Sequence, residues 1–278
     1  MPETIILDSD ADLKIGFPPP MLGPEPVRLP VAQVGEGLLA IALPGGVVSD
    51  AHPFYRDVPC AVASLQAQLR EEKPELQRLG MEVALAVNYV EPEISGLLLV
   101  ATNRTGVGRW RNAYGSGQLQ FTFEFVAAAN AAVADEVVCD LPVARHKARH
   151  KSEPRMLVSH KTGKKSRTEF RRKARKGDFE IWTATTTLPR LHQIRLHAME
   201  IGLKLPGDSL YEGLPFLTWG MLKGKKGPGG ECPILERPLI HLARIEAIGG
   251  LEGFAVVESR PDGRVSQVWA EIEQVQGV

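Results

Sequence analysis

Two acidic residues stand directly ahead of an apolar stretch and have the chemistry of catalytic groups. Glu91 and Glu93 lie in "NYVEPEISGLLLVATN", residues 88–103, just before a Ser-Gly pair. A positioned carboxylate can transfer a proton to or from a reacting group. Taken alone, however, a glutamate before a proline is typical of an exposed turn. Other parts of the sequence are needed to choose between a catalytic residue and an exposed turn residue.

A second polar group combines two arginines with a histidine and a glutamine. Arg190 and Arg195 bracket His192 and Gln193 at the start of a predicted helix. Guanidinium groups present forked donors that suit phosphate or carboxylate oxygens. This spacing indicates a site for an anionic group.

The charge of the chain is unevenly distributed. The whole sequence has 33 basic and 33 acidic residues and a net charge of zero. Residues 142–176 hold 14 lysines and arginines but only two acids, a local charge of +12. A run this dense favours a polyanion-binding surface over a merely solvated face. The candidate polyanion-binding residues in this segment are Lys164, Lys165, Arg167, Arg171, Arg172, Lys173 and Arg175.

Two other segments contain residues that can bind metal or phosphate but lack the spacing that such sites need. His146 and His150, with Cys139 nearby, have arginine and lysine between them and do not form the paired knuckles of a zinc site. The run "GKKGPGG", residues 224–230, lacks the Gly-Lys-Ser/Thr of a phosphate-binding loop. We therefore predict no metal and no cofactor.

The composition is that of an ordinary globular protein. The 278 residues, 44% of them hydrophobic, can bury a substantial core. No run of about 18 apolar residues occurs, and the first residues carry acids where a secretory signal carries bases. The three cysteines are far apart, which suits reduced thiols. We expect a cytoplasmic protein with no membrane association.

Strand patterns outnumber helix patterns, and the two do not alternate regularly. Helices are predicted over residues 60–80 and 191–203, the second ending at Gly202. Strands are predicted over residues 37–48, 96–102, 119–127, 166–175, 179–188, 238–248, 253–259 and 265–274. The two strands around Lys176 should form a hairpin that turns at Gly177-Asp178. This mixture indicates an α+β fold.

The N-terminal segment is rich in proline. Residues 1–30, including "GFPPPMLGPEP", show little apolar periodicity. We expect an extended arm on the surface of a domain that spans residues 31–278, and we expect its deletion to cost little stability.

One long block resembles a known family. The segment "LPRLHQIRLHAMEIGLKLPGDSLYEG", residues 188–213, is similar to the Gly-Arg-Thr-His-Gln-Ile-Arg-Val-His…Gly-Asp-x-x-Tyr-Gly block of RluA-type RNA pseudouridine synthases. Residues 34–53, 155–172 and 236–245 resemble further segments of that family in the same order. The resemblance covers roughly residues 32–275. It implies the pseudouridine synthase fold, a mixed and mainly antiparallel sheet with a central cleft and flanking helices.

The resemblance also assigns residues 88–96 to positions of a family motif. The family's catalytic motif is His-Arg-Leu-Asp-x-x-Thr-Ser-Gly, and alignment on the Ser-Gly puts Glu91 in the position of the essential aspartate. Tyr89 falls in the arginine position and Asn88 in the histidine position, while Phe123 falls where the family has an active-site tyrosine. Arg195 is retained and would pair with the carboxylate. Glu93 is set aside as an exposed residue.

The family isomerises uridine to pseudouridine in RNA, so two functions follow from the resemblance. The first is an RNA-binding protein for structured rRNA or tRNA, whose changes at Glu91, Tyr89 and Phe123 leave it impaired or inactive. The alternative is an active synthase that uses Glu91 as its carboxylate. In both cases Arg190, His192 and Gln193 would contact the RNA.

Overall fold

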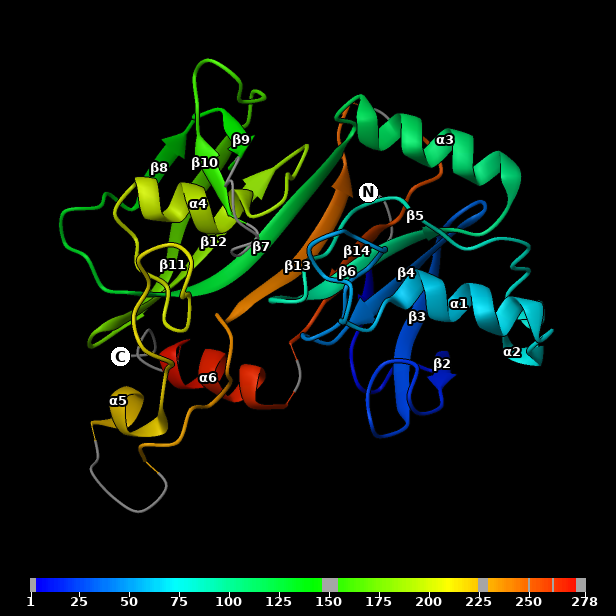
Figure 1. Ribbon diagram of the computed structural model, residues 1–278, viewed down its shortest axis with the longest axis horizontal. Coiled ribbons are helices and arrows are strands. Elements are labelled where there is room, and N and C mark those ends of the chain that lie inside the picture. Colours follow the sequence, from blue (N-terminus) through cyan, green and yellow to red (C-terminus); the bar gives the residue numbers. More distant parts are fainter. Residues whose placement is uncertain (1–3, 147–154, 225–229, 250, 262, 274–278) are drawn as a thin grey trace. The chain divides into compact units, whose positions relative to one another are not determined.

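The computed structural model describes residues 4–146, 155–224, 230–249, 251–261 and 263–273 (Figure 1). The chain divides into two compact units. Residues 1–121 and 242–261 form the first, and residues 122–241 and 262–278 form the second. Each unit has a mainly antiparallel sheet and a few helices, which confirms the predicted α+β class. The predicted central cleft stays a prediction.

The first unit is built on a sheet whose strands run in the order β2, β3, β4, β6 and β13. Their bounds are Lys14–Phe17, Val27–Gly35, Leu38–Leu43, Ile94–Ala101 and Ile240–Ala247. All eight residues of β6 are buried, as expected for an apolar run with covered faces. Short strand β5, Leu85–Ala86, also pairs with β6. Helices α1 (Ala61–Arg70), α2 (Pro74–Arg78) and α3 (Arg104–Gly115) complete the unit.

The N-terminal segment is not a peripheral arm, and that expectation was wrong. Strand β1 (Thr4–Leu7) pairs in parallel with β14 (Val256–Ser259), and β2 pairs antiparallel with β3. Ile15 and Phe17 are 0% and 2% exposed. The prolines that suggested an extended chain follow β2, whereas the strands themselves are apolar. The pairing partners lie far along the chain, so local periodicity did not reveal them.

The second unit has a sheet with the order β7, β12, β11 and β8. These strands span Leu119–Ala128, Phe179–Thr186, Thr168–Lys176 and Glu136–Cys139. Lys176 pairs with Phe179, so the predicted Gly177-Asp178 turn is confirmed. A separate hairpin joins β9 (Val143–Arg145) to β10 (Met156–Val158). Helix α4 spans Gln193–Glu200, and the chain turns at Gly202 with a φ of 88°, as predicted.

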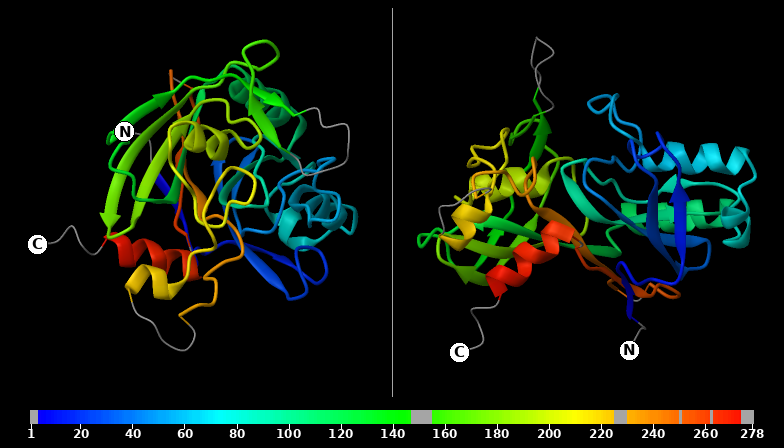
Figure 2. Two further views of the ribbon diagram at one scale, coloured as in Figure 1. Left: turned by 60° about the vertical axis from the view of Figure 1, so that its left-hand side comes forward. Right: turned by 90° about the horizontal axis from the view of Figure 1, so that it is seen from below.

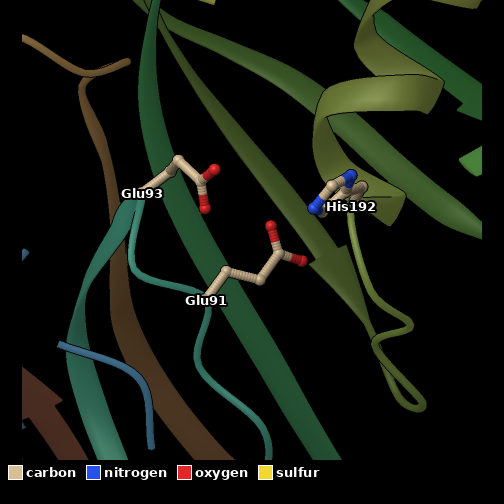
Figure 3. A group of neighbouring side chains, drawn as sticks. All are labelled: Glu91, Glu93 and His192. Atoms are coloured by element: carbon tan, nitrogen blue, oxygen red, sulfur yellow. The ribbon is translucent and has the colours of Figure 1, made fainter. Parts of the chain in front are cut away.

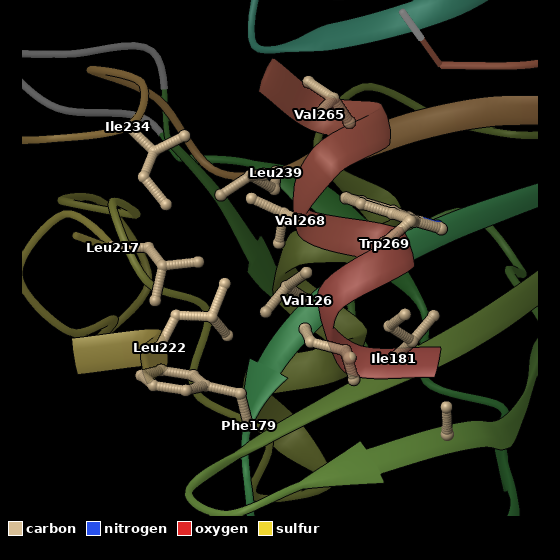
Figure 4. Packing of buried hydrophobic residues seen from close by; sticks show 12 residues of the cluster. Val126, Phe179, Ile181, Leu217, Leu222, Ile234, Leu239, Val265, Val268 and Trp269 are labelled. Atoms are coloured by element: carbon tan, nitrogen blue, oxygen red, sulfur yellow. The ribbon is translucent and has the colours of Figure 1, made fainter. Parts of the chain in front are cut away.

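The last predicted strand is a helix. Residues 263–273 form α6, Gly263–Glu273, which lies beside α5, Trp219–Lys223 (Figure 2). The buried residues of α6 are Val265, Val268, Trp269 and Ile272. Their spacing follows one face of a helix, although valine and tryptophan also suit strands. They pack into an apolar cluster with residues of β7, β12 and α5 (Figure 4).

No helix among the described residues is long and apolar enough to cross a membrane.

Replacing Phe17 by alanine tests the corrected position of the N-terminal segment. Because the side chain is 2% exposed in the core, the change should lower the free energy of unfolding by about 3–5 kcal/mol. Leu13 is 53% exposed, so Leu13→Ala should change it by no more than about 0.5 kcal/mol. Urea denaturation of both variants measures these changes in the free energy of unfolding. Equal, small changes would show that the N-terminal segment is a peripheral arm.

Candidate active site and nucleic-acid interface

Glu91 lies in a tightly hydrogen-bonded turn before β6. The amide of Val90 donates to the Ser49 hydroxyl at 2.8 Å, and the amide of Gly46 donates to the carbonyl of Pro92 at 2.7 Å. Glu91 itself is only 4% exposed. The exposed-turn interpretation is therefore excluded for this residue. Its carboxylate is held by a rigid backbone, which is what a functional group needs.

Two neighbours fix this turn to the sheet. The side chain of buried Asn88 donates to the carbonyl of Leu97 at 3.1 Å and accepts from the amide of Leu99 at 2.8 Å. The residue in the family's histidine position therefore has a structural role. Gly96 has a φ of 113°, and a Cβ there would lie 2.2 Å from the carbonyl oxygen of Leu242. The Ser-Gly of the motif thus keeps a glycine because no side chain fits between β6 and β13.

Glu93 belongs to the same turn. It is partly buried, and its carboxyl group points to the same side of the turn as that of Glu91 (Figure 3). Carboxylate oxygens of the two residues lie within 4.8 Å of each other. Glu93 also accepts a long hydrogen bond, 3.4 Å, from the Tyr55 hydroxyl. The expectation that Glu93 is an exposed bystander was therefore wrong.

Tyr89 places a neutral hydroxyl beside these carboxylates. Its oxygen is buried and has no hydrogen-bond partner among the described residues. Burial, and then the negative charges of Glu91 and Glu93, raise the pKa of this phenol well above its ordinary value. The hydroxyl therefore keeps its proton as a donor. The centroid of the Tyr89 ring lies 5.6 Å from that of His52. His52 was not among the residues predicted from the sequence, and only the His-Pro in the resembling segment 34–53 could have indicated it.

In the second unit, His192 precedes α4 in an unusual conformation. Its φ of 56° and ψ of 11° are left-handed, which non-glycine residues adopt at a cost. The residue is 1% exposed. Its Nδ1 lies 2.8 Å from the Tyr211 hydroxyl, which accepts a hydrogen bond from the Met156 amide at 2.9 Å. Strain of this kind persists where the surroundings fix the residue, often at functional sites.

Arg195 forms a buried bidentate ion pair. Its Nε and Nη2 donate to the two carboxylate oxygens of Asp208 at 2.7 and 2.8 Å, and both side chains are 2% exposed. Burial alone would raise the pKa of Asp208. Hydrogen bonds and charge from Arg195, together with the amides of Leu210 and Tyr211, outweigh it and lower that pKa. The expected pairing of Arg195 with Glu91 stays a prediction.

The other residues of this block hold β11 and β12. Gln193 is 1% exposed, and its amide nitrogen donates to the Arg167 carbonyl and to the hydroxyls of Thr168 and Thr186. The geometry therefore does not support Gln193 as an RNA contact. The guanidinium of Arg190 donates to the Lys165 carbonyl and to Ser166, so it too has structural partners.

The predicted phosphate contacts on and beside β11 are paired with acids. Arg172 and Lys173 each have two carboxylate partners, and the Arg172 side chain is only 18% exposed. The pairs are Arg167–Glu169, Arg171–Glu136, Arg172–Asp135, Arg172–Glu180, Lys173–Glu124, Lys173–Glu273 and Arg175–Glu180. Much of the positive charge of this strand is therefore neutralised within the protein. Strand alternation could not reveal these acids, because all of them except Glu169 lie outside β11.

A different group of cations is available. Lys161, Lys164 and Lys165 are exposed, and within the described ranges none of them forms an ion pair. Lys161 lies within a turn in which the Gly163 amide donates to the Ser159 carbonyl at 2.8 Å, and Lys164 and Lys165 follow that turn. Lys161 was not among the predicted contacts. Residues 147–154 and 225–229, which include His150 and most of the "GKKGPGG" run, lie outside the described residues.

The known proteins to which this chain is similar are RNA pseudouridine synthases of low sequence identity. No protein-family model matches the chain. It is 21% identical over 225 residues to an uncharacterised RNA pseudouridine synthase of Chlorobaculum parvum, covering 81% of this chain and 68% of that protein. It is 26% identical to the ribosomal large subunit pseudouridine synthase D of Yersinia pestis, and 26% identical to the dual-specificity RNA pseudouridine synthase RluA of Vibrio vulnificus. Those alignments cover 69% and 63% of this chain but only 55% and 65% of the relatives' own lengths.

Solved structures with similar folds belong to the same kind of protein. Human RNA pseudouridylate synthase domain containing 4 matches with a TM-score of 0.60 and 12% identity, covering 84% of this chain and 89% of that one. Human RNA pseudouridylate synthase domain containing 1 matches with a TM-score of 0.57 and 17% identity, covering 84% and 83%. The fold and the resemblance predicted from the sequence are thereby supported.

Asp208→Asn tests the buried ion pair. The change leaves the Arg195 guanidinium buried beside a neutral amide, and it should lower the free energy of unfolding by about 3–5 kcal/mol at neutral pH. Because the folded-state pKa of Asp208 is lowered, its contribution is complete above the unfolded-state pKa and is lost as the pH falls through the folded value. The stability difference between the natural protein and the variant should therefore shrink only in acid. A difference independent of pH down to about 2 would show that the ionised pair is not its source.

Proposed function

We propose that this chain is an RNA-binding protein of the RluA-type pseudouridine synthase family whose own catalytic activity is impaired or absent. The observation that carries the proposal is the buried Glu91, 4% exposed, on a rigid turn before the Ser-Gly of β6. The resemblance puts this residue where the family has its essential aspartate. The location of a functional carboxylate is kept, and the groups that would assist it are changed.

Each change removes a specific part of the chemistry. Glutamate moves the carboxylate outward by one methylene, on the order of 1 Å, and a misplacement of that size can cost about a hundredfold in rate. Tyr89 offers a neutral hydroxyl where the family has a cation, whereas unstacking a base costs a few kcal/mol. Phe123, on the buried face of β7, keeps a ring but has no hydroxyl.

The alternative is an active synthase that uses Glu91. One observation favours it, because hydrogen bonds of Ser49, Val90 and Pro92 fix the turn that carries Glu91, and a catalytic group needs a fixed position. A fixed backbone could compensate for the longer side chain. The Tyr89 hydroxyl, which has no partner among the described residues, could also donate to a substrate oxygen.

The proposed partner is structured RNA, either ribosomal or transfer RNA, and a cytoplasmic location suits both. The names of the relatives support this class of substrate. Of the basic residues, we assign the main phosphate contacts to Lys161, Lys164 and Lys165, because their ammonium groups are exposed and carry no ion pair among the described residues. Phosphate contacts of this kind position a protein on RNA without reading its sequence.

Salt dependence distinguishes the two groups of cations. Neutralising phosphates releases counterions, so each lost contact reduces the slope of log affinity against log salt by roughly 0.7–0.9. Lys161→Gln, Lys164→Gln and Lys165→Gln together should reduce that slope by about 2–3 for a structured RNA. The measurement is filter binding to an rRNA fragment at several salt concentrations.

The matched control removes the same number of charges from the paired group. Arg167→Gln, Arg171→Gln and Arg175→Gln together should change the slope little, because these side chains already have acidic partners. If the control flattens the slope and the lysine variant does not, β11 supplies the RNA contacts instead.

Release of tritium from RNA labelled at C5 of uridine tests the catalytic part of the proposal. The natural protein should release little tritium, and Glu91→Asp alone should recover little. Residues that act as a unit contribute non-additively, so recovery should require Tyr89→Arg and Phe123→Tyr as well. Thermal melts of each variant verify that it is folded.

Two outcomes separate the alternatives. Robust release by the natural protein that Glu91→Ala abolishes would overturn the impaired synthase and establish Glu91 as the working carboxylate. Release that Glu91→Ala leaves unchanged would place the carboxylate elsewhere and contradict both functions.

A further inference from the structure

A pocket of about 400 Å³ lies in the second unit, at the helices α5 and α6. Helix α5 contributes Trp219 and Lys223 to its walls, and α6 contributes Gln267, Ala270 and Glu271. The three residues of α6 are spaced three and four apart, so they share one face of the helix. This face points away from the one that packs into the core. We call the site the α5–α6 pocket.

Trp219 gives the pocket an aromatic wall. The other three tryptophans of the chain, Trp110, Trp182 and Trp269, are buried, whereas Trp219 is partly exposed. Trp219 also packs against the apolar cluster of α6, which fixes its position from one side. An aromatic ring that is held by the core and reaches a pocket offers a surface on which a planar group can stack.

A cation already lies over this ring. The ammonium group of Lys223 is 5.0 Å from the centroid of the Trp219 ring. The Lys223 side chain is 46% exposed and ends in a flexible stem, so it can move without disturbing the core. A cation–π contact at an exposed site is weak. A stacked ring can therefore take the place of this ammonium group on Trp219.

The pocket has an excess of positive charge. Glu271 is the only carboxylate among the lining residues, and Lys176 forms an ion pair with its Oε1 and donates to its backbone carbonyl at 3.1 Å. Lys223 is 3.7 Å from the other carboxylate oxygen. Because Lys176 already neutralises Glu271, the charge of Lys223 is in excess. This charge favours a ligand with an anionic group.

The two remaining lining residues leave room for a ligand and can read its polar edge. Gln267 is exposed, and its amide offers both donors and an acceptor. Ala270 is exposed and has no side chain beyond its Cβ to fill the pocket. An aromatic surface, an amide and a cation together match the three parts of a nucleotide, which are a flat base, its polar edge and a phosphate.

We propose that the α5–α6 pocket binds one nucleotide. The base stacks on Trp219, the Gln267 amide bonds the polar edge of the base, and Lys223 moves from the ring to the phosphate. A free mononucleotide and an unpaired nucleotide of an RNA strand both offer this chemistry. None of the lining residues is among the proposed RNA contacts, and the site needs neither Glu91 nor uridine isomerisation. The inference therefore stands or fails independently of the proposed function.

Titration of the full chain with AMP, followed by tryptophan fluorescence, tests the proposal. Stacking on the partly exposed Trp219 should give a saturable quench. Lys223→Gln should weaken binding about threefold to tenfold, since exposed charge pairs contribute modestly. Ala270→Leu, which fills the pocket from an exposed position, should abolish saturation. Lys204→Gln removes an exposed lysine of the same unit outside the pocket and should leave the affinity unchanged.

Equilibrium dialysis with radiolabelled AMP measures the Trp219→Leu variant, which lacks the fluorescent group. Its affinity should fall about fivefold or more, the effect of losing one stacked base. Thermal melts verify that each variant is folded. Failure of both AMP and tetraadenylate to bind saturably would overturn the proposal. Inorganic phosphate that binds as tightly as AMP, or an AMP affinity that Ala270→Leu leaves unchanged, would overturn it as well.

Tetraadenylate distinguishes the two sources of the nucleotide. If it binds more tightly than AMP and Ala270→Leu removes this advantage, the pocket holds an unpaired nucleotide of an RNA strand. Without such an advantage, the occupant is a free mononucleotide.

Discussion

The buried pair of Arg195 and Asp208 is the interaction on which the second unit's polar site depends. Two ions at 2% exposure are costly to bury unless both are fully hydrogen-bonded. The carboxylate of Asp208 accepts hydrogen bonds from two guanidinium nitrogens and two backbone amides. The pair joins α4 to the loop that carries Tyr211, and Tyr211 in turn bonds His192. One buried charge therefore fixes several of the family's motif residues at once.

The first unit positions Glu91 by a different means. The backbone around it is held by the side chains of Asn88 and Ser49. Asn88 replaces the histidine of the family motif and still ties the turn to β6. The loss of catalysis that we propose would therefore change side chains while the scaffold beneath them is kept.

Electrostatics also has two separate roles here. Arg172 and Lys173 each meet two carboxylates, so part of the basic segment stabilises the sheet and its contact with α6. Lys161, Lys164 and Lys165 have no such partners among the described residues. The acidic remainder of the chain supplies all the partners of the β11 cations, and Glu169 of the basic segment pairs with Arg167 just ahead of the strand. Local charge in a sequence is therefore a poor measure of the charge that a surface presents.

The sequence by itself determined the elements whose signals are local. Periodicity and turn chemistry predict the burial of β6, the Gly177-Asp178 hairpin and the helix that ends at Gly202. The order of the motif residues predicts the alignment of Glu91 with the family's aspartate. Only the tertiary structure decided that β1 and β2 join the sheet, that residues 263–273 form a helix, and which arginines are neutralised. These outcomes depend on partners distant in the chain. Strand pairing and ion pairing bring together residues that are far apart in the chain. A pattern of neighbouring residues therefore does not predict them.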